Sequence, residues 1–113
     1  MIAIAWNNGG HQASGSGYGV KIAPADRDQF FRREWGEVLL ELSGEAQPIA
    51  CNIDKDSFWT PSCRELINVG LGRWLRKNGL APWKDGCPPK LKLIPIADNR
   101  FRLQFEREGQ DAA

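Results

Sequence analysis

Short runs in which apolar and polar residues alternate recur along this chain, and they constrain its fold more than any other feature. Such alternation is typical of half-buried β-strands, because successive side chains of a strand point to opposite faces of the sheet. Clusters of Gly, Asn, Ser and Pro, which favour turns, separate most of the runs. We therefore expect about seven short strands, and six alternating runs are clear, at residues 1–6, 18–22, 38–42, 49–53, 91–94 and 101–105.

Two other segments have the spacing of short helices. Aromatic residues of segment 26–35 can share one helix face, and segment 65–78 has Leu and Trp side chains at helical spacing before an Asn-Gly pair. So many strands in 113 residues do not suit an open α/β sheet, which needs strands and full helices in alternation. The sequence predicts a mainly β (α+β) fold, an open pseudobarrel of about seven strands with two short helices.

The length and composition favour one domain over residues 1–113, with a disordered tail from about residue 107. The sequence contains neither a run of 18 apolar residues nor a basic leader at its start, so we expect a cytoplasmic protein without a membrane partner. Cys51, Cys63 and Cys87 are odd in number and widely spaced, which favours reduced thiols over a disulfide framework.

The sequence offers no recognisable catalytic or metal centre. His11 is the one histidine, and it lies in a Gly-rich segment without a neighbouring cysteine or acid. Asp26 and Asp28 lie near the start of a predicted helix, where carboxylates commonly cap the helix and complement its dipole. We therefore expect a protein that is not an enzyme and needs no cofactor or metal.

The charge balance excludes a protein that binds nucleic acid through overall positive charge. Fifteen basic side chains against 14 acidic ones leave a net charge of +1. Any binding to a polyanion must then depend on local clusters of cations. Arg73, Arg76 and Lys77 of the second predicted helix are one such cluster, or simply its solvated face.

Residues 7–19 form a long loop with five glycines. Glycine lets the backbone approach a polyanion closely, and polar side chains of this kind can contact base edges or phosphates. The loop is therefore interpreted either as a recognition element or as a disordered hairpin tip. Its candidate binding residues are Asn7, Asn8, His11, Gln12, Ser14 and Ser16.

A second irregular segment covers residues 55–64. It combines small hydroxyl side chains with a cation at each end, a composition suited to phosphate contacts. Phe58 fits the core, whereas Trp59 suits either packing or stacking. The candidate binding residues here are Lys55, Ser57, Trp59, Thr60, Ser62 and Arg64.

A series of motifs covers most of the chain, from residue 18 to residue 105. In order they are GYGVKI, FFRREW, EVLLEL followed by PIACNI, SFW, GRWLRKNGLAPWKDG, KLKLIPI and RFRLQF. This order resembles the DNA-binding pseudobarrel family, which includes the plant B-three transcription-factor domain and the effector domains of certain bacterial restriction endonucleases. The aromatic pair Phe58-Trp59, Trp74 in the second helix and the Asn-Gly-Leu turn at residues 78–80 support the resemblance.

The resemblance implies a non-catalytic domain that grips the major groove of double-stranded DNA with two loops. Mapped by position, the N-arm is residues 7–18 and the C-arm is residues 55–64. Tyr18 and Lys21 then join the residues already singled out in these loops as candidate DNA contacts. The N-arm contains no Lys or Arg of its own. The alternative function is a small protein–protein interaction or adaptor module without a role in nucleic-acid binding.

Overall fold

A computed structural model describes residues 1–61 and 63–105 of the chain. All seven of the strands in these residues join one sheet, in the order β4-β3-β7-β6-β1-β2-β5. Neighbouring strands are antiparallel except β3 and β7, which are parallel. The strands are β1 (Ile2–Asn7), β2 (Tyr18–Ile22), β3 (Glu37–Leu42), β4 (Ile49–Asn52), β5 (Glu65–Ile67), β6 (Lys90–Ala97) and β7 (Arg100–Phe105).

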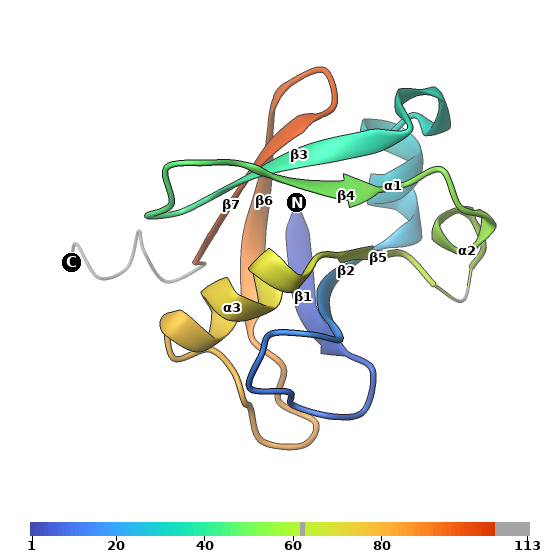
Figure 1. Cartoon of the computed structure of the whole chain (residues 1–113). Helices are drawn as coiled ribbons and strands as arrows, with labels where there is room; N and C mark the ends of the chain where they lie inside the picture. The colour runs from blue at the N-terminus through green and yellow to red at the C-terminus, as the bar shows by residue number, and fades with distance from the viewer. Residues whose placement is uncertain (62, 106–113) are drawn as a thin grey trace.

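The sheet curls into a nearly closed barrel, which confirms the predicted β-rich pseudobarrel (Figure 1). Its two edge strands, β4 and β5, approach each other without pairing. Asn68 bridges the gap between them, because its side-chain Nδ2 donates a hydrogen bond to the Ala50 carbonyl over 2.7 Å. The gap between β4 and β5 is thus closed by a side-chain hydrogen bond rather than by strand pairing.

Over the part of the chain that the structure describes, three short α-helices and one 3-10 turn accompany the sheet, where the sequence predicts two helices. The predicted helix in segment 26–35 is two pieces, since the chain is extended at Phe31. The one-turn helix in the C-arm was expected to be irregular. These elements are α1 (Pro24–Phe30), the 3-10 turn η1 (Arg33–Trp35), α2 (Asp56–Trp59) and α3 (Val69–Lys77).

The predicted start of the last helix at residue 65 is wrong, and the reason is strand pairing. Residues Glu65–Ile67 form β5, which pairs with β2 at Gly19, Val20 and Lys21. The helix begins only after Asn68, whose side-chain oxygen accepts a hydrogen bond from the backbone N–H of Gly70. An Asn at this position is a preferred N-cap, and it therefore marks the boundary between strand and helix.

The core lies inside the barrel and is built by the inward-facing alternate residues of the strands. On β1, for example, Ala3 and Ala5 are buried, whereas Ile2 and Ile4 face outward. α1 follows β2 directly, whereas α3 follows β5, contacts the Tyr18 end of β2 and buries Trp74 in the core. The start of α1 borders the outer face of β1 and β2, where Pro24 and Asp26 lie beside Ile2 and Ile4.

Candidate nucleic-acid interface

The two arms lie at opposite ends of the β2–β5 pair. The N-arm leads into β2 at Tyr18, and the C-arm leads into β5 at Glu65. Because the two strands are antiparallel, with Lys21 opposite Glu65, the C-arm reaches the far end of β2 at Ile22. At a rise of about 3.3 Å per residue, the four steps from Tyr18 to Ile22 separate the arms by about 13 Å. The sheet register thus sets the spacing of the two loops.

The N-arm is folded against α3 rather than standing free. Gly15 is buried, and a Cβ placed on it would lie 2.7 Å from the backbone nitrogen of Arg73. Arg73 in turn donates from Nε to the Ser14 carbonyl over 3.3 Å. Within the loop, the Asn8 N–H donates to the Gly17 carbonyl over 3.0 Å. The helix therefore brings an arginine to an arm that has no cation of its own.

A hydrogen-bonded chain of side chains fixes the base of the N-arm. The two ring nitrogens of His11 contact Asn7 Nδ2 at 2.8 Å and the Tyr18 hydroxyl at 2.7 Å. Arg76 of α3 donates to the same hydroxyl over 3.1 Å. The His11 ring also meets Trp83 edge-on, with ring centroids 4.7 Å apart. The base of the arm is thus tied to β1, β2 and α3.

The C-arm is held by a buried cation that sequence analysis did not single out. Arg27 of α1 donates to the carbonyls of Phe58 and Thr60 over 3.2 Å and 3.0 Å. Trp59 donates from its indole nitrogen to the Ile53 carbonyl over 2.8 Å, and the Arg27 guanidinium lies 5.7 Å from its ring centroid. The sequence gives little indication of this role for Arg27, since an arginine inside a helical segment usually faces solvent.

The predicted binding residues differ widely in exposure. Tyr18 is fully buried, so its contribution to an interface is indirect, through His11. Ser62 lies outside the described residues. The exposed candidates are Asn8, Gln12, Ser14, Ser16 and Ser57. The half-buried candidates are Asn7, His11, Lys21, Lys55, Trp59, Thr60 and Arg64.

Cations without ion pairs gather around the arms and on the outer face of the neighbouring strands. Among the described residues, six cations pair with carboxylates: Arg27, Arg32, Arg33, Lys77, Arg100 and Arg102. The cations for which the described residues provide no ion pair are Lys21, Lys55, Arg64, Arg73, Arg76, Lys84, Lys90 and Lys92. Seven of these eight cations lie on β2, β6, the C-arm and α3.

Carboxylates near the C-arm are largely engaged by other residues. Arg33 pairs with Asp54 at 3.3 Å and with Asp56 at 2.8 Å. Glu65 is buried, and its carboxylate accepts a hydrogen bond from the backbone N–H of Arg64. Among the described residues, none of these carboxylates forms an ion pair with Lys55 or Arg64.

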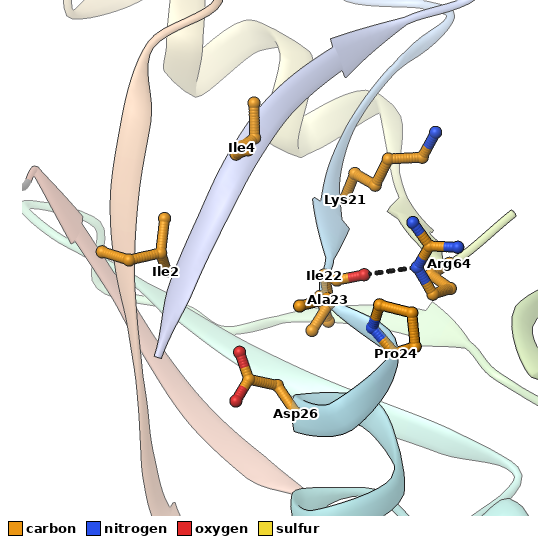
Figure 2. Close-up of a pocket in the computed structure, with 8 residues that line it drawn as sticks. All are labelled: Ile2, Ile4, Lys21, Ile22, Ala23, Pro24, Asp26 and Arg64. Atoms are coloured by element: carbon orange, nitrogen blue, oxygen red, sulfur yellow. Dashed lines mark hydrogen bonds between the residues drawn. The ribbon is translucent and has the colours of Figure 1, made fainter. Parts of the chain in front are cut away.

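The outer face between the arms is partly apolar. Ile4 lies opposite Lys21 on β2 and opposite Lys90 on β6, and Ile2 lies opposite Lys92. A shallow pocket of about 320 Å³ opens beside Ile2 and Ile4, as Figure 2 shows. Its lining residues are Ile2, Ile4, Lys21, Ile22, Ala23, Pro24, Asp26 and Arg64.

Arg64 is oriented toward this face by the backbone. Its Nε donates to the Ile22 carbonyl over 2.7 Å, the bond drawn in Figure 2, and its guanidinium also contacts the Pro61 carbonyl. Arg64 is thus anchored at the end of β2 where the C-arm meets the sheet.

Compared with models of protein families, with curated proteins and with solved structures, the chain shows no significant match. Among residues 1–61 and 63–105, no helix has both the length and the apolar character needed to cross a membrane.

Proposed function

We propose that this protein is a non-catalytic domain that binds double-stranded DNA by placing its two arms in the major groove. The observation that carries the proposal is the gathering of unpaired cations around the arms, on a chain whose overall charge is only +1. The spacing of the arms supports it, because about 13 Å along β2 is close to the major-groove width of about 12 Å.

The proposal divides the contacts into two classes. Lys21, Lys55, Arg64 and Arg73 neutralise phosphates, which supplies affinity without sequence preference. The exposed polar side chains of the N-arm read base edges, and amides are suited to this because they donate and accept together. These base-reading residues are Asn8, Gln12, Ser14 and Ser16, with Ser57 from the C-arm. Ser62 stays a prediction from sequence.

One observation favours a second function, a module that binds an apolar protein partner. Ile2, Ile4 and Ile67, on the outward faces of β1 and β5, are each about 40% exposed, and Val69 at the start of α3 is 44% exposed. Exposed apolar side chains are a common feature of protein-binding surfaces, and here a single strand, β2, separates the two strands that carry the isoleucines. The surrounding lysines favour DNA over this alternative, because an apolar interface core is depleted of charge.

The test is a titration of the whole chain against a pool of duplexes with a randomised core, at two salt concentrations, followed by sequencing of the bound fraction. Enrichment of a short motif, with an affinity that falls as salt rises, supports sequence reading by the arms. Binding without enrichment limits the function to phosphate contacts. The absence of binding at low salt contradicts the proposal and favours the protein-binding module.

A further inference from the structure

The hydrogen bonds around His11 determine which of its nitrogens holds the proton. The backbone N–H of Gly9 donates to Asn7 Oδ1 over 3.0 Å, which fixes the orientation of the Asn7 amide. Asn7 Nδ2 therefore faces His11 Nε2, at 2.8 Å. An amide nitrogen can only donate, so Nε2 must accept. The proton of the neutral ring then lies on Nδ1 and is donated to the Tyr18 hydroxyl oxygen, 2.7 Å away.

In their observed orientation, the described residues that contact the His11 ring provide no acceptor for a second ring proton. The described contacts of the ring are Asn7 from β1, Tyr18 from β2 and the Trp83 ring. One charged group, Arg76 of α3, donates a hydrogen bond to the Tyr18 hydroxyl, and Lys84 and Asp85 follow Trp83 in the sequence. No carboxylate in the described residues is hydrogen-bonded to His11. A proton added to Nε2 would thus point at an N–H donor.

We propose that His11 is the positioning residue of the N-arm: its neutral form holds the arm in place, and uptake of a proton from solvent at Nε2 releases it. With Nε2 protonated, either the ring leaves its position or the Asn7 amide turns over. If the amide turns over, its oxygen faces Nε2 and its nitrogen faces the Gly9 N–H, so the bond that orders the first turn of the arm is lost. Both routes loosen residues 8–17.

The consequence for DNA rests on the proposed function. A released arm no longer presents Gln12, Ser14 and Ser16 as a fixed set to base edges, so sequence preference is lost even though the ring has gained a positive charge.

The first experiment uses the protein without DNA. Long-range ¹⁵N–¹H spectra report the tautomer of His11, and amide exchange reports the order of the N-arm, at about pH 8 and about pH 5. The exchange rates are corrected for intrinsic pH dependence. We expect the Nδ1–H tautomer at the higher pH, and a loss of about tenfold or more in protection at Gly9 and Gly15 that follows ring protonation.

The matched variant is Asn7→Asp. Its carboxylate has nearly the shape of the amide but accepts a hydrogen bond from a protonated Nε2, so the arm stays protected at the lower pH. A second variant, His11→Gln, removes the titrating group and makes the protection independent of pH. The proposal is overturned if the neutral ring holds its proton on Nε2, or if protection is the same above and below the protonation of His11.

DNA titrations with the same samples separate this inference from the proposed function. If the arm is released on protonation but no duplex binds at either pH, the positioning role of His11 stands and the DNA-binding function fails. If a preferred duplex binds equally well before and after His11 protonation, the positioning role fails and the DNA-binding function stands. The expected result is a loss of sequence preference on protonation in the wild type, and its retention in Asn7→Asp.

Discussion

Gly72 of α3 approaches Gly15 of the N-arm so closely that a Cβ on Gly72 would lie 2.0 Å from the Gly15 carbonyl oxygen. Gly15 has a positive φ of 90°, a conformation that favours glycine. Both positions lack the space for a side chain, and the backbone conformation of Gly15 favours glycine as well. Together they let the loop lie on the helix.

Replacing Gly72 with Ala should destabilise the protein, although Ala in a helix ordinarily stabilises by about 1 kcal/mol relative to Gly. The added methyl group collides with backbone, which cannot move aside as a flexible side chain can, so we expect a net loss of about 1–3 kcal/mol in the free energy of unfolding. Chemical denaturation measures it. Gly10→Ala is the control, because its Cβ meets only the Gln12 side chain at 3.5 Å. Equal stability of the two variants would contradict this account.

Replacing Arg27 with Ala should loosen the C-arm. The change removes the hydrogen bonds to the Phe58 and Thr60 carbonyls from a buried position, and we expect a loss of about 2–4 kcal/mol in the free energy of unfolding. Denaturation and limited proteolysis of residues 55–64 check this. The control is Asp28→Asn, which removes only the ion pair to an exposed carboxylate and should cost less than about 1 kcal/mol. An intact C-arm in Arg27→Ala would show that the arm is held by other contacts.

Arg73→Gln should weaken DNA binding and lower the salt dependence of log Kd by about one unit, the effect of losing one phosphate contact. The matched control is Arg102→Gln, since Arg102 is also exposed but lies on β7 and pairs with Glu41. Titrations at several salt concentrations compare the two variants. If both lower the slope equally, the effect is one of net charge, and Arg73 has no particular place in the interface.

The free energy of unfolding should fall as the pH rises above about 9, because the Cys51 thiol is buried. Burial raises the pKa of this thiol from 9.0 to about 12, with Glu37 adding to the increase and Lys55 opposing it. Above about pH 9 the thiol ionises in the unfolded chain but not in the folded one, so the unfolded state binds fewer protons. The protonated Cys51 thiol therefore contributes fully to the free energy of unfolding below about pH 9. Between about pH 9 and 12 this contribution falls by about 1.4 kcal/mol per pH unit.

Denaturation of the wild type and of Cys51→Ala across this pH range tests the effect. The variant is expected to be less stable at neutral pH, because it leaves a cavity, but to lose less stability as the pH rises. The other titrating groups are common to both proteins and cancel in the comparison. Parallel stability curves would mean that Cys51 ionises as readily in the folded protein as in the unfolded chain.

Elements whose signal is local could be predicted from the sequence. The alternation at residues 18–22 and 101–105 gave β2 and β7 at nearly their observed limits, because side chains of a strand alternate wherever the strand lies. β5 was missed, since three residues from Glu65 to Ile67 have no pattern of their own and become a strand through pairing with β2. The α2 turn was missed for a similar reason, as its four residues are too few for a periodicity.

The candidate site divides in the same way. Composition alone singled out both arms, because glycine-rich and hydroxyl-rich loops stand out from strands in any chain of this kind. Only the tertiary structure shows that Tyr18 is buried in the core. It also shows that Arg27 binds a carbonyl of the C-arm and that Arg73 binds a carbonyl of the N-arm, which has no cation of its own. These relationships join residues that are tens of positions apart, and they depend on the barrel register and on backbone contacts as close as Gly15 and Gly72. Sequence spacing describes neighbours along the chain, whereas such contacts exist only when the whole sheet has closed.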